Sequence, residues 1–182
     1  EILNMLNVKY FIIPTEEGVQ AQQNPEAFGN AWLVNEVNWA ENANEAILSL
    51  GETKLDSAAV IHVENKNLVP TDIEADPSAE IELISQQPNE LVYKSNASKE
   101  QLAVFSEIYY PNGWKATIGG KESDHFRVNY VLRGMMIPAG EHEIRFKFEP
   151  EVVKTGSMIS LSASILLGLL LLGGLFYKYK RK

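Results

Sequence analysis

An uncharged run near the C-terminus constrains this chain more than any other feature. Residues 158–177 read MISLSASILLGLLLLGGLFY and contain no Asp, Glu, Lys or Arg. Because a helix rises about 1.5 Å per residue, about 20 residues cross the roughly 30 Å hydrocarbon core of a bilayer. The run therefore predicts one transmembrane helix. A buried helix of a soluble protein is the alternative interpretation.

The residues that flank this segment indicate its orientation. Residues 178–182 (KYKRK) carry four positive charges, whereas residues 149–154 contain two glutamates and one lysine. Basic residues collect on the cytoplasmic side of transmembrane helices, and aromatic residues such as Tyr177 collect at the membrane interface. We therefore expect residues 178–182 to form a cytoplasmic tail and the N-terminal bulk of the chain to lie outside the cytoplasm, attached to the lipid bilayer.

Charge and cysteine content narrow the classes of function. Four of the 16 Lys and Arg residues lie in the tail. The rest of the chain therefore has 12 basic and 24 acidic residues, a net charge of −12. Such an acidic surface repels nucleic acid, so no nucleic acid partner is expected. The chain has no cysteine, which excludes disulfide bonds and thiolate metal sites and leaves packing to stabilise the domain.

The start of the chain predicts a larger protein. Glu1 is followed by an apolar stretch without the layout of a signal peptide, although a domain outside the cytoplasm needs an upstream export signal or transmembrane segment. Upstream helices of the same protein are therefore expected partners. Ser160, Ser164 and Gly168 recur every four residues and would let such a helix approach closely, although Leu-rich helices also carry small residues by chance.

The first part of the chain, residues 1–63, predicts the end of a helix, three strands and one short helix. The short helix follows Asn42, a good N-cap with Glu45 three residues later, and stops at Gly51. β-branched and aromatic runs mark the expected strands at residues 8–13, which end before Pro14, and at residues 31–37 and 58–63. Polar connections are expected at residues 15–30 and 64–78.

The second part, residues 79–150, predicts an antiparallel β-sandwich. Residues 141–148 alternate between apolar and charged side chains, which indicates one buried and one exposed face. Residues 102–109 carry apolar side chains at both even and odd positions, as in a central strand covered on both sides. The expected strands are residues 79–87, 90–95, 102–110, 114–118, 126–137 and 141–148.

Turn residues separate these strands at regular intervals. Residues 110–113 (YPNG) and 137–140 (IPAG) place proline second and glycine fourth, and Gly119-Gly120 suits a two-residue hairpin. This spacing favours a sandwich. The fold class is therefore mainly β, a jelly-roll-like sandwich with one short helix, followed by the single transmembrane helix.

No motif in the chain predicts catalysis, a cofactor or a metal. His62, His125 and His142 lack the spacing of metal ligands, and His142 is interpreted as a core or edge residue. The acidic residues of 72–76 alternate as in a calcium loop, but Pro77 replaces the glycine that an EF-hand needs, so a solvated acidic loop is expected. The chain also lacks a G-x-S-x-G elbow, a P-loop and a dinucleotide fingerprint.

One aromatic and acidic cluster stands out as a candidate binding site. Glu107, Tyr109, Tyr110 and Trp114 surround a strand end and a tight turn. Exposed aromatic faces stack on sugars and carboxylates bond to their hydroxyl groups, so the cluster is a candidate glycan or partner site. The alternative is structural: Trp114 and Tyr109 close the edge of the sandwich while Glu107 pairs with an arginine, either Arg127 or Arg133.

The same region carries a family resemblance. The run FSEIYYPNGWKATIGGKE and the later run VNYVLRGMMIPAGEHEIRFKFEP, both within residues 105–150, resemble the C-terminal part of the YfhO family of bacterial multi-pass membrane proteins. The early runs LNVKYFI and GNAWLV resemble it too. The resemblance implies a protein similar to glycosyltransferases that use lipid-linked sugars and modify cell-envelope polymers. It implies no catalytic residue in this chain.

These observations lead to three hypotheses. The first is an accessory extracytoplasmic domain of a glycosyltransferase-like membrane protein that helps to position an envelope glycan or polymer. The second is a noncatalytic module or envelope scaffold that binds polysaccharide or protein, and the third is a purely structural cap. The sequence does not decide whether the cluster from Glu107 to Trp114 is a binding site or a structural one.

Overall fold

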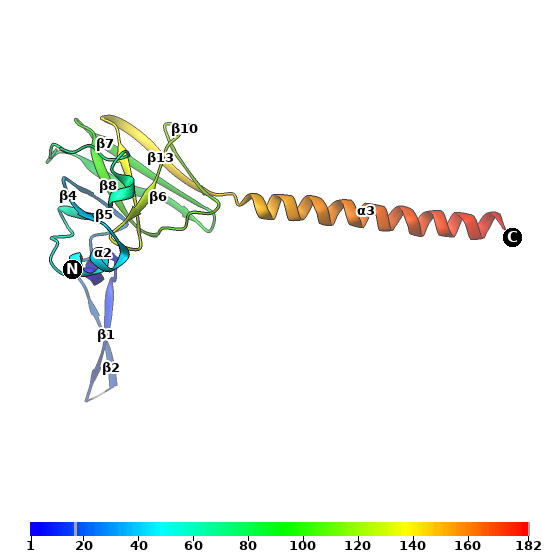
Figure 1. The fold of residues 1–182 in the computed structure, drawn as a ribbon. Helices are drawn as coiled ribbons and strands as arrows, with labels where there is room; N and C mark the ends of the chain where they lie inside the picture. Colours follow the sequence, from blue (N-terminus) through cyan, green and yellow to red (C-terminus); the bar gives the residue numbers. More distant parts are fainter. Residues whose placement is uncertain (17, 182) are drawn as a thin grey trace.

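The computed structural model describes residues 1–16 and 18–181. Two stacked β-sheets form the body, a hairpin projects from it, and one long helix leaves it (Figure 1). Strands account for 42% of the chain and helices for 24%, so the prediction of a mainly β sandwich followed by a long apolar helix is confirmed. In the described residues, one sheet contains, in spatial order, β10 (Lys121–Glu122), β9 (Trp114–Ile118), β13 (Gly140–Phe148), β7 (Glu90–Ala97) and β6 (Glu80–Gln87).

The second sheet of the described chain is strongly curled. Its spatial order is β3 (Ala31–Val34), β8 (Gln101–Ile108), β12 (Leu132–Ile137), β11 (Phe126–Val128), β5 (Ala58–His62) and β4 (Glu36–Ala40). Five strand spacings in a flat sheet would place β3 and β4 about 24 Å apart. Only Asn35 separates these strands in the chain, and a two-residue step reaches about 7 Å at most. The sheet therefore curls so that its two edge strands, β3 and β4, meet at one corner.

Two apolar cores lie on opposite faces of β8. Ala103 and Phe105 pack between the two sheets, whereas Leu102 and Val104 pack on the other face of the curled sheet. All four side chains have no exposed surface. This arrangement confirms that residues 102–105 form a central strand covered on both sides.

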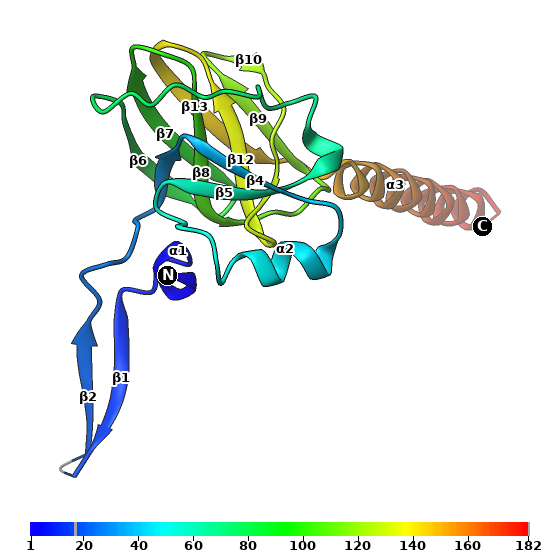
Figure 2. The same ribbon diagram turned by 60° about the vertical axis from the view of Figure 1, so that its left-hand side comes forward.

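Two short helices, α1 (Ile2–Met5) and α2 (Ala43–Ser49), close the second core, and both lie below β4 and β5 in Figure 2. The Asn42 side chain accepts a hydrogen bond from the Glu45 N–H at 3.0 Å, as the predicted N-cap requires. α2 connects β4 to β5, and these two strands are parallel, as a helical crossover permits.

The N-terminal hairpin differs from the sequence prediction. β1 (Tyr10–Thr15) runs through Pro14 and pairs with β2 (Gly18–Gln23), which lies where a polar loop is expected. Both strands of a two-stranded ribbon are edge strands, where proline is tolerated, so Pro14 does not end β1. β2 is rich in glutamine and lacks the apolar alternation that marks a half-buried strand, because the ribbon projects into solvent (Figure 1).

Two further predicted strands are each divided into two. Residues 31–37 break at Asn35, where the N–H groups of Asn35 and Glu36 both donate to the Ser57 carbonyl oxygen. Residues 126–137 break at Asn129 and Tyr130, which have positive φ angles of 47° and 68° and reverse the chain between β11 and β12. Asparagine tolerates this conformation, so a hairpin turn forms without glycine.

The Asn129 turn also joins two segments of the curled sheet. Asn129 is fully buried, and its side-chain oxygen accepts a hydrogen bond from the Val60 N–H at 2.8 Å. Its own N–H donates to the Val60 carbonyl oxygen at 2.8 Å. The N-Y-V-L-R run therefore fixes β5 beside the β11–β12 hairpin.

A long helix, α3 (Glu151–Lys180), follows the last strand after only Glu149 and Pro150. In the described residues it is the one helix long and apolar enough to cross a membrane, with a mean hydropathy of 2.2, and none of that span is buried. It contains the predicted transmembrane segment, residues 158–177. Lys182, the end of the predicted basic tail, lies outside the described residues.

Candidate functional site

The candidate cluster begins at an irregularity in β8. Phe105 pairs with Arg133 of β12 and Ile108 pairs with Leu132, so Ser106 and Glu107 have no partner in β12. Such a bulge changes the direction of nearby side chains. Ser106 is held from the other side, because its hydroxyl donates to the Met5 carbonyl oxygen at 2.6 Å.

Arg133 occupies the centre of the cluster, between the two sheets. It is 1% exposed, and its guanidinium carbon lies 4.6 Å from the ring centre of Trp114 and 4.7 Å from that of Phe146. Nη2 donates a hydrogen bond to the Ile108 carbonyl oxygen at 3.2 Å. Nε and Nη1 have no hydrogen-bond partner among the described residues. A buried arginine in this position stabilises the aromatic packing through cation–π contacts.

Glu107, on the neighbouring strand β8, supplies an opposing charge to this arginine. Burial raises the pKa of the half-buried Glu107 carboxyl, and the positive charge of Arg133 opposes that effect. Burial also lowers the pKa of Arg133, whereas the negative charge of Glu107 raises it. Of the two arginines that the sequence offers as a partner, the structure places Arg133 inside the sandwich, whereas Arg127 is exposed.

Tyr93 and His125 complete the buried part of the cluster, and the sequence reasoning missed both. Burial raises the pKa of Tyr93, and the charge of Glu107 adds to this effect. Burial lowers the pKa of His125 to about 4, and the charge of Arg133 acts in the same direction, so the imidazole is neutral near pH 7. Among the described residues, the Tyr93 hydroxyl and Nε2 of His125 have no hydrogen-bond partner.

The four candidate residues divide between the interior and the surface. Trp114 contacts Arg133, and its ring centre also lies 5.3 Å from that of Phe148. Tyr109 packs edge-on against His125 with ring centres 5.7 Å apart. Tyr110 differs from these residues, because half of it is exposed.

The turn after Tyr110 packs against the start of α3. Gly113 has a φ of +94°, and a Cβ on it would lie 2.9 Å from both the Phe148 ring and Cβ of Pro150. The Gly113 carbonyl oxygen accepts a hydrogen bond from the Glu149 N–H at 2.6 Å. This turn therefore needs glycine for its conformation and for its close approach, and it joins the cluster to the base of the helix.

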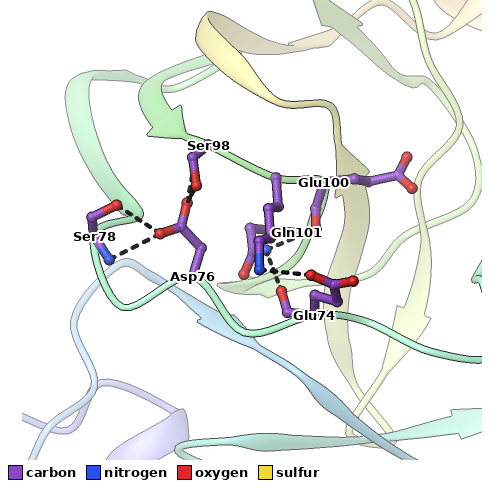
Figure 3. A network of polar contacts seen from close by, with 7 residues as sticks. Glu74, Asp76, Ser78, Ser98, Glu100 and Gln101 are labelled. Carbon is purple, nitrogen blue, oxygen red and sulfur yellow. Dashed lines mark hydrogen bonds and ion pairs between the residues drawn. The ribbon is translucent and has the colours of Figure 1, made fainter.

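A second polar network lies in the connection between the two parts of the chain (Figure 3). The Asp76 carboxylate accepts hydrogen bonds from the hydroxyl and N–H groups of Ser78 and Ser98, at distances of 2.5 to 3.0 Å. Glu74 pairs with Lys99 at 2.6 Å. The acidic loop is therefore fastened to the β7–β8 turn rather than only solvated.

The Asp76 contacts predict a pH-dependent contribution to stability. The Ser78 hydroxyl, followed by the Ser98 hydroxyl, holds the pKa of Asp76 well below its usual range. A depressed folded-state pKa stabilises the fold above the usual carboxyl pKa of about 4, and this contribution is lost as the pH falls below that value. We expect Asp76→Asn to lower the melting temperature at pH 7. The difference from the parent protein should shrink in a melting series taken down to pH 3.

A matched substitution separates the effect of the Asp76 hydrogen bonds from the effect of losing one acidic charge. Asp72→Asn removes the same charge from the same connection and is expected to leave the melting temperature nearly unchanged. Equal effects of the two substitutions, or a constant difference between Asp76→Asn and the parent from pH 7 to pH 3, would contradict the role of the Asp76 contacts.

The remaining sequence candidates lie apart from the cluster. Within residues 1–16 and 18–181, no group of three His, Cys, Asp or Glu side chains is placed to hold a metal ion. Nε2 of His142 lies 3.0 Å from the Ala139 carbonyl oxygen. In α3, the Ser164 hydroxyl donates to the Ser160 carbonyl oxygen at 2.9 Å, and a Cβ on Gly168 would meet no atom within 4 Å.

Comparison with known proteins identifies the family. The model of the bacterial membrane protein YfhO matches residues 15–160, which include most of the β domain and the beginning of α3. No curated protein and no solved structure matches the chain. The match covers well over half of the chain, and the long apolar helix agrees with a membrane protein. The chain therefore belongs to the YfhO family of bacterial membrane proteins.

Proposed function

We propose that this chain is the accessory extracytoplasmic domain and following transmembrane helix of a multi-pass, glycosyltransferase-like protein. In this proposal, the domain positions an envelope glycan or polymer while catalysis takes place elsewhere in the protein. The Lys residues in the last turn of α3 support a cytoplasmic C-terminus, because basic residues collect on that side. The acidic composition of the domain fits a location away from anionic polymers of the cytoplasm.

The observation that carries the proposal is the anchored turn at Tyr110. Its neighbours Trp114 and Tyr109 pack inward, whereas Tyr110 presents its ring to solvent on a turn fixed to Pro150 through Gly113. A rigid exposed aromatic ring close to the membrane end of the domain suits the capture of a polymer that grows from the membrane. Aromatic rings bind sugars through their apolar faces and lose little conformational entropy on binding.

We expect Tyr110→Ala to weaken binding of envelope polymer about five- to tenfold, because stacking on one aromatic ring contributes about 1 to 1.4 kcal/mol. The measurement is a pull-down titration of cell-wall polysaccharide with the detergent-solubilised chain. Tyr110 lies on the surface, so its replacement should leave the melting temperature of the domain nearly unchanged.

Tyr10→Ala provides the matched control, because Tyr10 is also an exposed tyrosine (60%) but lies on the projecting hairpin. This variant should bind polymer as the parent does. The proposal would be wrong if the two variants bound equally well, or if the parent bound no polymer.

A noncatalytic scaffold is the second candidate function, and the inward packing of Trp114 favours it. The contacts of Trp114 with Arg133 and Phe148 give this side chain a structural role without any ligand. In this case, Ser160, Ser164 and Gly168 would pack against upstream helices, and the domain would hold the assembly together. Unimpaired polymer modification by a protein that carries Tyr110→Ala would favour the scaffold.

A further inference from the structure

A cavity of about 830 Å³ lies where the β domain meets α3. Lys115 of β9 lines one side, Lys154 and Thr155 of α3 line the other, and Phe148 and Met158 provide apolar surface. The cavity therefore joins strands of the sandwich to the first two turns of the helix. Figure 1 shows that α3 leaves the sandwich at this end.

The charges around the cavity are unusual for such an acidic domain. Lys115 and Lys147 are directly opposite each other on β9 and β13, a pairing that places two positive charges side by side. Glu149 neutralises Lys147 through an ion pair of 2.6 Å. Within the described residues, neither Lys115 nor Lys154 forms an ion pair, although both lysines line the cavity.

The pKa of Glu149 supports this arrangement of charges. The hydrogen bond from Lys147 lowers it most, followed by the charge of Lys147 and then by the charges of Lys115 and Lys154. The ammonium groups of Lys115, Lys147 and Lys154 therefore all act on the Glu149 carboxylate. The lining of the cavity itself holds two lysines, Lys115 and Lys154, and two glutamates, Glu149 and Glu151, and the Glu149 carboxylate is already paired with Lys147.

The position of the cavity matches the level of lipid headgroups. Lys154 precedes Met158, the first residue of the apolar segment, by four residues, or about 6 Å along the helix. The polar headgroup region on each side of a bilayer is about 5 to 7 Å thick. The Lys154 ammonium would therefore lie beside lipid phosphates when α3 spans the membrane, and Met158 would lie beside the first carbons of the acyl chains.

We infer that this cavity binds the headgroup of an anionic phospholipid from the leaflet into which α3 inserts. The phosphodiester would accept hydrogen bonds from the ammonium groups of Lys115 and Lys154, and the acyl chains would run along α3 past Met158. A lipid bound in this way would fix the height of the domain above the membrane. This inference does not depend on whether the domain binds a glycan.

Lipid retention by the whole chain tests the inference. The chain is purified in detergent with either phosphatidylglycerol or phosphatidylcholine, and bound lipid is counted by native mass spectrometry. We expect the parent to retain about tenfold more phosphatidylglycerol than phosphatidylcholine, because each lysine near an anionic lipid contributes about fivefold, partly offset by Glu151. The double variant Lys115→Gln with Lys154→Gln should lose this preference.

A second double variant, Lys9→Gln with Lys121→Gln, removes the same charge away from the cavity and should retain phosphatidylglycerol as the parent does. The basic C-terminal residues are present in every variant and contribute equally. Equal retention of phosphatidylglycerol by the parent and the Lys115/Lys154 variant would overturn the inference. Displacement of the lipid by millimolar glycerol phosphate would also overturn it, because the free headgroup would then be sufficient.

Discussion

Replacing Arg133 by alanine is expected to lower the free energy of unfolding of the β domain by about 3 kcal/mol or more. The side chain fills the space between the rings of Trp114 and Phe146, so truncation leaves a cavity and removes two cation–π contacts. It also leaves Glu107 half-buried without the charge that opposes its desolvation. Urea denaturation followed by tryptophan fluorescence measures the loss.

Two further substitutions show which property of Arg133 matters. Arg133→Met keeps an unbranched chain between the rings and removes two buried nitrogen atoms, Nε and Nη1, whose N–H groups lack partners, so it should cost less than half as much. Arg127→Ala alters an exposed arginine on the adjacent strand and should change stability by about 0.5 kcal/mol at most. An Arg133→Ala variant as stable as Arg127→Ala would show that the guanidinium does not support the sandwich.

Replacing Gly113 by alanine is expected to destabilise the protein by about 2 to 4 kcal/mol. A φ of +94° strains any residue with a Cβ, and that Cβ would collide with the Phe148 ring and with Pro150 at 2.9 Å. The collision falls where the sandwich is connected to α3, so the substitution should weaken the packing between the β domain and the start of the helix. Thermal unfolding in detergent measures the loss of stability.

Gly119→Ala separates backbone strain from this collision. Gly119 also has a positive φ, +56°, but a Cβ there would meet no atom within 4 Å. Its replacement should cost only the strain, about 1 kcal/mol or slightly more. Equal losses for the two alanine variants would show that the turn does not press against the start of α3.

Elements defined by local chemistry could be predicted from the sequence. The uncharged run predicted α3, the Asn42 cap predicted α2, and Gly119-Gly120 predicted the two-residue turn between β9 and β10. The alternation in residues 141–148 predicted β13, in which Ile144 and Phe146 are buried. In each case, the signal lies in neighbouring residues and does not depend on tertiary contacts.

Elements defined by distant contacts were not predicted. The breaks at Asn35 and Asn129 depend on Ser57 and Val60, which the sequence does not place beside them. β2 lacks an apolar face because it pairs only with β1 in the projecting hairpin. A search for periodicity therefore misses all three features.

The candidate site was predicted in part. The sequence identified the cluster of Glu107, Tyr109, Tyr110 and Trp114, but it did not show that Tyr110 is its one exposed member or that the cluster surrounds Arg133. One signal was available: Arg133 has the same parity as Met135 and Ile137, so a strand there places it on the core face. The same parity argument fails for Glu107. The bulge at Ser106 shifts the register between β8 and β12, so the position of Glu107 along β8 does not show that it lies near Arg133.

Selective labelling of single cysteines tests the central claim, an extracytoplasmic β domain fixed to a helix with its C-terminus in the cytoplasm. The chain has no cysteine, so one introduced at exposed Thr71 or at Lys180 reports its own side of the membrane. In intact bacteria, a membrane-impermeant maleimide should label Thr71→Cys directly and Lys180→Cys only after permeabilisation. Labelling of Lys180→Cys in intact cells, with Thr71→Cys protected until permeabilisation, would contradict the account.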